Sequence, residues 1–405
     1  MMKSALDRDQ GGRRGRSLKI DVVVHGRFDA FHLARALLAR GHDVRLLTNY
    51  PRWAVRRFGL PGDCVSPFTL HGIASRLYAR TPRRLRSNLG EAALHRTFGA
   101  WAARAVRKDA ELVYAFSGVA EELLKRPRAS DRPQIWLVRG SAHIRTQHQL
   151  LSDEEARVGV VVDKPALWMI EREEREYALA ERIVTLSTFA HSTFGERPAL
   201  AQKAFLLLAA VDTSRFHSGP QVVQERIRRI ESGAPLRVLT VGTFSFRKGA
   251  HDLVEVAAAL HDKMQFRFVG DVPAETRHLH AKALRIIDFR PRIMEFDLVA
   301  HYNWADIFVF PTIEDGFAAV VAQAKASSLA VITTPNCSGP DLIRHGQSGW
   351  IVPIRNAKGI IDLLTYCDAH RAELAKVIDA SFMLFKPRDW SAMAADVETA
   401  FAAQA

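Results

Sequence analysis

The hydrophobic positions of this chain form short buried runs, each followed by a polar turn and then an amphipathic segment. A run of four or five β-branched or aromatic residues predicts a strand covered on both faces, and the amphipathic segment predicts a helix. This order repeats along the 405 residues. It indicates parallel sheets flanked by helices, because a helix is the usual connection between parallel strands.

The clearest unit of this kind spans residues 307–335. Ile307–Phe310 predicts a buried strand, which Pro311 ends because proline cannot donate to a sheet ladder. We expect a helix from about Phe317 to Ser327 and a second buried strand at Ala330–Thr333. The loop after the first strand then lies at the carboxyl edge of the sheet, where open parallel sheets bind ligands.

That loop carries two carboxylates, Glu314 and Asp315, and leads directly into the expected helix start. Carboxylates accept hydrogen bonds from hydroxyl groups, and the free N–H groups of a helix start bind anions. The combination indicates a ligand with both hydroxyls and phosphates, such as a nucleotide sugar.

A cationic loop follows another predicted strand, Arg237–Val241. It runs from Gly242 and ends with Arg247 and Lys248, just before a helix that begins after Gly249. Two cations beside a helix start make a diphosphate site. Plain surface charge is the alternative, and the position at a strand's carboxyl end argues against it.

The chain opens with a further strand, loop, helix and strand at Lys19–Asn49. The helix is expected from about Ala30 to Arg40, ended by Gly41. The loop contains Gly26 and Arg27, where a ligand could approach the backbone closely. It lacks the three glycines of the dinucleotide fingerprint, which argues against NAD or FAD.

Two further segments carry polar residues. His143 follows the predicted strand Gln134–Val138; a histidine there can be purely structural, but its place at the ligand edge of the sheet favours a function. The charged segment Ile170–Phe194 predicts an amphipathic helix leading into a strand. Its glutamates are expected to form a solvated face: Glu171, Glu173, Glu174 and Glu176.

The net charge of +13 is concentrated in residues 52–108, where arginines alternate with aromatic and leucine residues. Arginine and aromatic residues on helices are typical of an interfacial membrane surface. A solvated basic face over an ordinary core explains the pattern as well. We expect no nucleic-acid partner, because no recognised binding motif accompanies the charge. An anionic membrane surface remains a candidate partner of this region.

Residues 1–18 predict a disordered basic tail without the apolar core of a secretory signal. No apolar run approaches the ~18 residues needed to span a membrane. The three cysteines, Cys64, Cys337 and Cys367, show no metal-type spacing and no obvious pairing. We therefore expect a cytoplasmic protein, with peripheral contact to the inner face of the cell membrane as a further expectation.

Together these motifs resemble those of the retaining glycosyltransferases of family 4, which have the GT-B fold. The family carries two acids with seven residues between them around Gly-Phe; here Asp315 holds the first place and Gln323 the second. Its Gly-Arg and Lys-Gly pair appears here as Gly242 with Thr243, and Lys248 before a glycine. Thr243 therefore replaces the family's arginine, and Gln323 replaces its second acid.

The resemblance covers nearly the whole chain after about residue 19 and is strongest over residues 238–356. It implies two doubly wound, Rossmann-like domains facing each other across a cleft. The implied parts are a disordered tail at 1–18, an N-terminal acceptor domain at 19–211, a linker at 212–234, a C-terminal nucleotide-sugar donor domain at 235–385, and a C-terminal helix at 386–405 that crosses back to the first domain.

The resemblance also implies the roles of single residues. Arg247 and Lys248 would neutralise the leaving diphosphate, Asp315 would accept hydrogen bonds from sugar hydroxyls, and His143 would contact the transferred sugar. Gln323 would hold the ribose, since an amide can still bond both ribose hydroxyls. The other expected donor-binding residues are Gly26, Arg27, Gly242, Thr243, Gly270, Arg290 (largely through backbone at the base), Glu314, Gly316, Phe317 and Ala318.

The implied activity moves a sugar from a nucleotide-diphosphate sugar to a glycan or lipid-linked acceptor with retention, in bacterial-type surface polysaccharide or glycolipid synthesis. We expect no cofactor beyond the donor and no metal, because the Asp-x-Asp metal motif belongs to another glycosyltransferase fold. The only one here, Asp7 to Asp9, lies in the tail. A GT-B protein that binds nucleotide sugars without turnover is the alternative, favoured by Thr243 and Gln323. Sugar-nucleotide epimerases share the fold but lack this acidic loop in this form.

Overall fold

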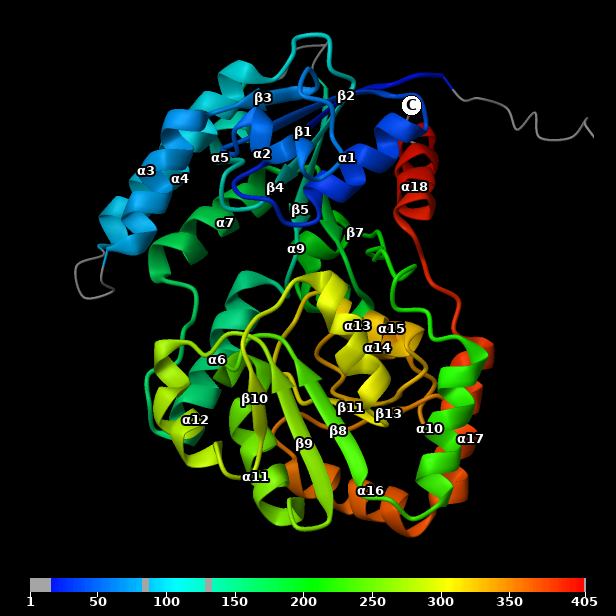
Figure 1. Ribbon diagram of the computed structural model, residues 1–405. Coiled ribbons are helices and arrows are strands. Elements are labelled where there is room, and N and C mark those ends of the chain that lie inside the picture. Colours follow the sequence, from blue (N-terminus) through cyan, green and yellow to red (C-terminus); the bar gives the residue numbers. More distant parts are fainter. Residues whose placement is uncertain (1–15, 82–86, 128–132, 404–405) are drawn as a thin grey trace, which may run out of the picture. The chain divides into compact units, whose positions relative to one another are not determined.

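The computed structural model describes residues 16–81, 87–127 and 133–403. Its strands form two sheets (Figure 1), with the orders β3-β2-β1-β4-β5-β6-β7 and β10-β9-β8-β11-β12-β13. Neighbouring strands pair in parallel, as β1 does with β2 and β8 does with β9. The predicted class, doubly wound α/β with two parallel sheets, is confirmed. By compactness the chain divides into one unit of residues 1–115 with 122–136 and another of 116–121 with 137–405.

The elements of the first sheet alternate as the hydrophobic pattern predicts. They are β1 (Lys19–Val24), α1 (Ala30–Ala39), β2 (Asp43–Thr48), α2 (Arg52–Arg56), β3 (Val65–Pro67), α3 (Thr69–Arg80), α4 (Asn88–Ala105), β4 (Leu112–Phe116), α5 (Glu121–Leu124), β5 (Gln134–Arg139), α6 (Ile144–Val158), α7 (Leu167–Leu179), β6 (Arg182–Thr185), α8 (Thr188–Gly195), α9 (Pro198–Ala201) and β7 (Ala204–Leu206).

The elements that follow β7 include the strands of the second sheet. They are α10 (Pro220–Glu231), β8 (Leu236–Val241), the 3-10 turn η2 (Phe246–Lys248), α11 (Ala250–Leu260), β9 (Met264–Val269), the 3-10 turn η3 (Ala274–Thr276), α12 (Arg277–Ala283), β10 (Asp288–Arg290), α13 (Glu295–Trp304), β11 (Ile307–Phe310), α14 (Ala319–Ala326), β12 (Ala330–Thr333), α15 (Gly339–Leu342), β13 (Trp350–Ile351), α16 (Ala357–Ala369), α17 (Arg371–Leu384) and α18 (Trp390–Ala402).

The central strands of the second sheet are buried on both faces, which explains their continuous apolar sequence. Successive side chains of a strand point to opposite faces. Val238 of β8 and Val309 of β11 accordingly lie in one core, and Leu239 and Phe308 lie in the other. Helices can therefore cover both sides of this sheet.

The order of the second sheet places its switch point between β8 and β11. From β8 the chain moves outward to β9 and β10, and then returns to β11 on the other side of β8. β8 and β11 pair in parallel, with Val238 opposite Ile307. Their following loops therefore leave the same edge side by side, and such a point is where doubly wound sheets bind ligands.

The segment expected to be a linker contains a helix. α10 buries Val223 and Ile230 in the core of the second sheet, and its Arg226 guanidinium donates to the Ala305 and Ser327 carbonyl oxygens. Only a sparse apolar spacing marks this helix within a polar sequence, which is why the pattern missed it. The proposed limits of linker and domains remain predictions.

The prediction of a solvated glutamate face on α7 is wrong for two of its members. Glu173 is 3% exposed and Glu176 is fully buried. Glu176 accepts hydrogen bonds from the backbone N–H groups of Gly118, Ala120 and Glu121 at 2.6–3.0 Å. Charge pattern alone cannot reveal that this helix face packs against the backbone N–H groups that follow β4.

The C-terminal helix α18 is preceded by a segment tied to the chain after β7. Arg388 donates to the Leu208 carbonyl at 3.0 Å and accepts from the Val211 N–H at 3.2 Å. Within the described residues, no helix combines the length and apolar character required to cross a bilayer.

Candidate functional site

The cationic loop after β8 and the acidic loop after β11 meet at the switch point. Gly249 makes the contact sterically possible: its φ is +75°, and an added Cβ would lie 1.9 Å from the Pro311 carbonyl oxygen. A residue other than glycine would force the loops apart. The backbone N–H of Ile313 also donates to the Arg247 carbonyl at 2.9 Å, which joins the loops directly.

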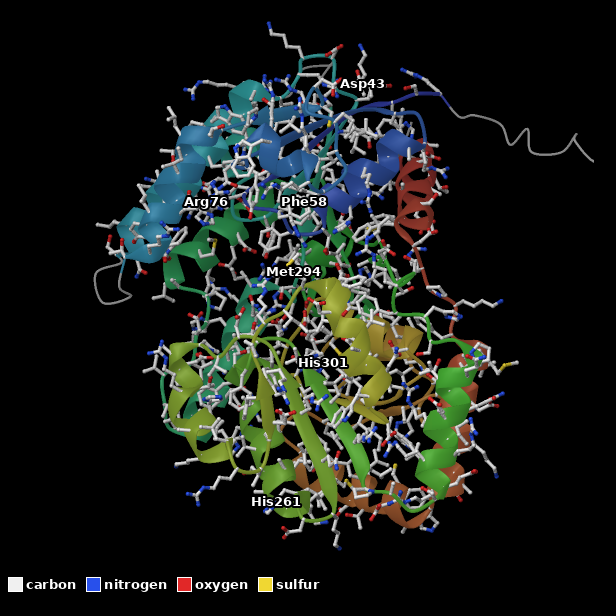
Figure 2. The ribbon with its side chains drawn as sticks, viewed as in Figure 1. Asp43, Phe58, Arg76, His261, Met294 and His301 are labelled. Atoms are coloured by element: carbon white, nitrogen blue, oxygen red, sulfur yellow. The ribbon has the colours of Figure 1, made fainter. Side chains whose placement is uncertain are left out.

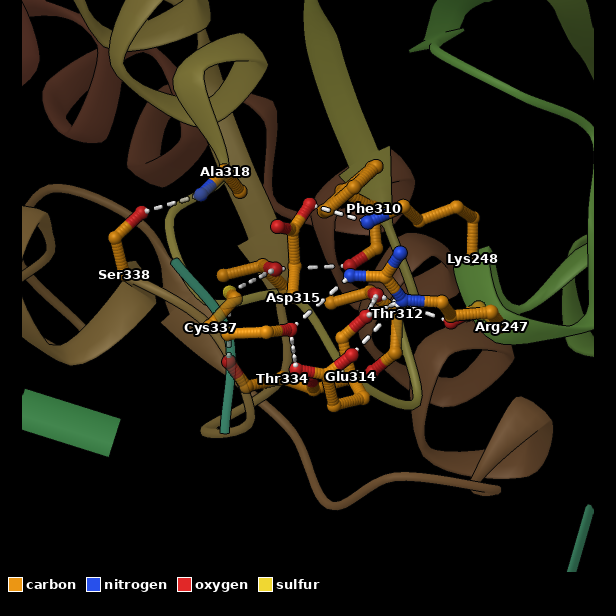
Figure 3. Close-up of polar contacts among 12 residues, drawn as sticks. Arg247, Lys248, Phe310, Thr312, Glu314, Asp315, Ala318, Thr334, Cys337 and Ser338 are labelled. Atoms are coloured by element: carbon orange, nitrogen blue, oxygen red, sulfur yellow. Dashed lines mark hydrogen bonds and ion pairs between the residues drawn. The ribbon is translucent and has the colours of Figure 1, made fainter. Parts of the chain in front are cut away.

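Two ion pairs connect the side chains of these loops (Figure 3). Arg247 Nε lies 2.8 Å from the Glu314 carboxylate, and Lys248 Nζ lies 2.5 Å from the Asp315 carboxylate. The side chains of Lys248 and Asp315 are each 18% exposed, so this pair faces partly outward. Burial and the neighbouring Arg247 lower the pKa of Lys248, while Asp315 opposes that shift.

Glu314 is the buried member of the acidic loop and is fully bonded. Its side chain is 0% exposed, and each carboxylate oxygen accepts from two donors. The donors are Ser141 Oγ at 2.5 Å, the Ala142 N–H at 3.1 Å, the Gln147 amide at 2.9 Å and Arg247 Nε at 2.8 Å. Glu314 was predicted to contact the donor; these bonds instead favour a role in holding its neighbours in place.

The pKa of Glu314 follows from these contacts. Burial raises the pKa, but Arg247, Lys248 and the hydrogen bonds from Ser141 and Ala142 outweigh it and lower the pKa to about 2. The carboxylate therefore stays ionised at neutral pH. Sequence reasoning missed Ser141 and Gln147, and the only available signal was their position after the buried strand β5.

A third loop, between β5 and α6, packs against the acidic loop at Gly316. A Cβ on Gly316 would lie 2.1 Å from the Gly140 carbonyl oxygen and 2.4 Å from Ser141 Cα. Only glycine permits this approach. The three strand-end loops that follow β5, β8 and β11 therefore converge within one unit.

His143 lies on this third loop as the N-cap of α6. Its Nδ1 accepts from the Arg145 N–H at 3.2 Å, which assigns the ring proton to Nε2. Burial, followed by nearby arginines such as Arg197, lowers its pKa to about 3, so the ring is neutral. The ring packs on Tyr177 and Phe194 and is 1% exposed. Contact with a donor sugar, as the resemblance implies, would require these neighbours to move.

The acidic loop continues into α14, which begins two residues later than expected. The helix starts at Ala319 rather than Phe317, and the Ala318 N–H donates to Ser338 Oγ at 3.2 Å (Figure 3). One of the N–H groups predicted to be free for a phosphate is thus already bonded. Ala318 is buried, and Phe317 is half-buried.

The remaining predicted donor residues of this unit lie along the same sheet edge. Gly242 follows β8, and its N–H donates to the Val269 carbonyl at 3.0 Å. Gly270 follows β9, and its N–H donates to the Arg290 carbonyl at 3.0 Å. The Arg290 side chain pairs with Asp288 at 2.9 Å. Thr243 is exposed.

Gln323, predicted to hold the ribose, lies on α14 and is 7% exposed. Its amide contacts Tyr302 and Glu295, both on α13. Sequence reasoning missed Glu295, because nothing in the motif places an acid 28 residues earlier beside this position.

Gly26 and Arg27 belong to the other unit, in the loop after β1. Gly26 has a φ of +107°, and its N–H donates to Asn49 Oδ1 at 3.0 Å. Arg27 lies over the Phe58 ring at 4.6 Å. Their predicted part in binding the donor sugar and the acceptor remains a prediction.

One group in the described part of the chain has the composition of a metal site. His251, Asp252 and Glu255 bring ligand atoms within 4.8 Å of one another. The Asp252 carboxylate already pairs with Arg157 at 2.8 Å. Because Arg157 already neutralises Asp252, the group is an ion-pair cluster on α11.

Comparisons with known proteins identify sequences that are similar to parts of this chain. Residues 235–367 match a family described as "Glycosyl transferases group 1". AmsK of Erwinia amylovora, an amylovoran biosynthesis glycosyltransferase, is 23% identical over 163 residues, which are 36% of this chain and 39% of AmsK. A Campylobacter jejuni N-acetylgalactosaminyltransferase acting on N,N'-diacetylbacillosaminyl-diphospho-undecaprenol is 30% identical over 148 residues, 34% of this chain and 38% of that enzyme. The matches thus span about two fifths of these relatives.

A solved structure extends the similarity to the whole fold. Anabaena HepE, crystallised with UDP and glucose, superimposes with a TM-score of 0.66 over 95% of this chain and 99% of HepE, at 13% identity. The fold is therefore GT-B. Residues 235–367 are similar to the group 1 glycosyltransferases, the retaining family 4.

We predict that Gly316→Ala destabilises the protein by about 2 kcal/mol, because its methyl group would collide with the Gly140 backbone. The free energy of unfolding from urea titrations measures the effect. Gly195→Ala is the matched control, since its Cβ would meet no atom within 4 Å. Equal stability of the two variants would contradict the close packing of the loops.

We predict that Glu314 makes stability depend on acid pH. Because its folded pKa is below the ordinary value of 4.5, its contribution is present above pH 4.5 and is lost as pH falls towards about 2. Glu314→Gln should remove that part of the pH dependence and cost about 3 kcal/mol at pH 7 by leaving Arg247 without its charge partner. Urea unfolding between pH 7 and pH 3 tests this, with exposed Glu231→Gln as control. If the unfolding free energy of Glu314→Gln depended on pH as strongly as that of the wild type, Glu314 would not be the source of this dependence.

Proposed function

We propose that this protein is an active retaining glycosyltransferase that takes a sugar from a nucleotide-diphosphate sugar. The observation that carries the proposal is the pair of oppositely charged loops at the switch point of the second sheet. They bring Arg247 and Lys248 beside Glu314 and Asp315, within the segment that matches the family. Cations suit the diphosphate and a carboxylate suits the sugar hydroxyls.

The Lys248–Asp315 pair is the part of this arrangement that a donor could open. Both side chains are partly exposed, whereas the Glu314 carboxylate is held by four donors. In the proposed complex, a donor diphosphate takes Asp315's place beside Lys248. Asp315 then accepts hydrogen bonds from sugar hydroxyls. The Lys248 ammonium and the Asp315 carboxylate thus each keep a bonding partner.

The chemical step exchanges one bond at the anomeric carbon. The acceptor oxygen forms its bond as the bond to the leaving phosphate oxygen breaks on the same face, and the acceptor proton passes to the leaving phosphate. Lys248 and Arg247 stabilise the negative charge that develops on the diphosphate, an effect typically worth ~3 kcal/mol per group. His143, with its proton on Nε2, would donate to a donor hydroxyl, and Gly26 with Arg27 would line the acceptor side.

The donor and acceptor are proposed from the relatives. HepE was crystallised with UDP and glucose, and the Campylobacter enzyme is named for a diphospho-undecaprenol acceptor. We propose that the acceptor here is a glycan or a lipid-linked sugar in bacterial-type surface polysaccharide or glycolipid synthesis. A nucleotide-sugar-binding protein without turnover is the second candidate, favoured by Thr243 and Gln323 in place of the family's arginine and acid.

A surface suited to the membrane supports a lipid-linked acceptor. Helix α3 exposes Leu70, Ile73 and Leu77, which are 50–78% exposed and three or four residues apart, on one side of the helix. Arg76 and Arg80 are exposed on the same helix, which contains no acidic residue. Figure 2 labels Arg76 there, and its guanidinium lies over the Tyr50 ring at 4.8 Å. We propose that α3 contacts an anionic membrane from the cytoplasmic side.

We predict that Lys248→Ala and Asp315→Ala each lower donor hydrolysis by about a hundredfold, because each removes a charge placed at the reacting group. The assay uses UDP-, GDP- and ADP-linked sugars, and exposed Lys263→Ala is the control. Unchanged hydrolysis in both variants would refute these roles. Nucleotide binding by calorimetry without any hydrolysis by the wild type would instead favour the binding protein.

We predict that the wild type sediments with phosphatidylglycerol vesicles but not with phosphatidylcholine vesicles, and less so at high salt. Arg76→Gln with Arg80→Gln should weaken binding about thirtyfold, at about 1 kcal/mol per arginine. Leu70→Ser, Ile73→Ser and Leu77→Ser combined should weaken it at least as much. Leu284→Ser, an exposed leucine on the other unit, is the control. Equal sedimentation of all variants would exclude α3 as the contact.

A further inference from the structure

The amide of Gln323 is fixed between two residues of helix α13. Tyr302 Oη donates to Gln323 Oε1 at 3.1 Å, and Gln323 Nε2 donates to Glu295 Oε1 at 3.3 Å. Tyr302 is fully buried, Gln323 is 7% exposed and Glu295 is exposed. In Figure 1 α13 lies beside α14, as these contacts require.

The chemistry of the partners determines which way the amide points. An ionised carboxylate only accepts hydrogen bonds, so the amide nitrogen must face Glu295. The Tyr302 hydroxyl then meets the amide oxygen as a donor. A flipped amide would place two acceptor oxygens together at Glu295.

The same geometry explains why an amide stands at position 323. A glutamate there would place a second carboxylate about 3.3 Å from Glu295, and two carboxylates so close cannot both remain ionised. With Gln323, Glu295 keeps its charge. One carboxylate therefore remains at this point of the site, but it belongs to α13 instead of α14.

We propose that Glu295 is the ribose-binding carboxylate of this protein, with Gln323 as the residue that orients it. The inference rests on the proposed function. A carboxylate accepts from both hydroxyls of a vicinal diol, while Gln323 has one oxygen lone pair occupied by Tyr302 and one N–H occupied by Glu295. We therefore assign to Glu295 the role of binding the ribose diol, which the resemblance assigns to Gln323.

The position of Glu295 along the sheet edge suits a ribose. It follows Arg290, the residue expected to contact the base, within the same short stretch of chain. Gln323, which it contacts, stands on the helix that follows the Asp315 loop. A ribose joins a base to a diphosphate, and Glu295 is linked to the first through the chain and to the helix beside the second through Gln323. Met294 (labelled in Figure 2) and Phe296 on either side are 75% and 71% exposed, so this turn is open to a ligand.

The test compares the binding of nucleoside diphosphates with that of their 2'-deoxy and 3'-deoxy forms, by calorimetry on the full chain. UDP, GDP and ADP are tried first, and the one that binds is used. Loss of a hydroxyl that bonds a charged group should weaken wild-type binding about 10- to 100-fold. Glu295→Gln should weaken binding of the ribonucleotide to a similar extent and should bring the ribo and deoxy affinities close together.

Exchange of the two side chains separates this proposal from a merely structural role of Glu295. Gln323→Glu alone should weaken binding, because it sets two carboxylates together. Glu295→Gln combined with Gln323→Glu should recover the affinity and the preference for the ribonucleotide, since a single carboxylate is restored. Asp297→Asn, an equal charge change in the first turn of the same helix, should leave both unchanged.

The outcomes separate the inference from the function on which it rests. If the wild type binds a nucleoside diphosphate but Glu295→Gln keeps the full ribo-to-deoxy preference, the assignment of Glu295 is overturned and the proposed function stands. A double exchange that binds as weakly as the single variants overturns it as well. If the wild type binds none of the three nucleotides, the proposed function itself fails.

Discussion

The buried carboxylate of Glu314 is the interaction on which the arrangement of the site depends. Its four hydrogen bonds come from the loop after β5, from helix α6 and from the loop after β8, while Glu314 itself lies in the loop after β11. A buried charge is tolerated only when it is paired and bonded. This requirement holds three loops from distant parts of the sequence in one fixed geometry, and the absent side chain of Gly316 lets them touch.

The two acids of the loop therefore differ in what they can do, although they are neighbours. Glu314 points inward and has no capacity left for a ligand. The Asp315 side chain is partly exposed, and its carboxylate pairs with Lys248, a contact that a phosphate could replace. This difference in bonding divides the loop into Glu314, which holds the neighbouring loops in place, and Asp315, which can exchange its partner.

Much of the site could be inferred from local sequence. The residues that were predicted wrongly or missed have a common cause. The strands, the cationic loop and the acidic loop follow from apolar runs, proline and glycine, which act within a few residues. Glu173, Glu176 and Glu295 were missed or misassigned because their environment comes from segments far away in the chain. The low exposure of His143 has the same origin, since the rings of Tyr177 and Phe194 cover it.

The sequence by itself determined the alternation of strands and helices, the two charged loops and the family that they resemble, because short-range periodicity and motif spacing carry that information. Only the tertiary structure decided which charges pair. Arg247 with Glu314, Lys248 with Asp315, and Glu295 with Gln323 are contacts between residues 28 to 67 positions apart. Such pairs form because the sheet order brings strand ends together at one edge, and no local pattern records that order.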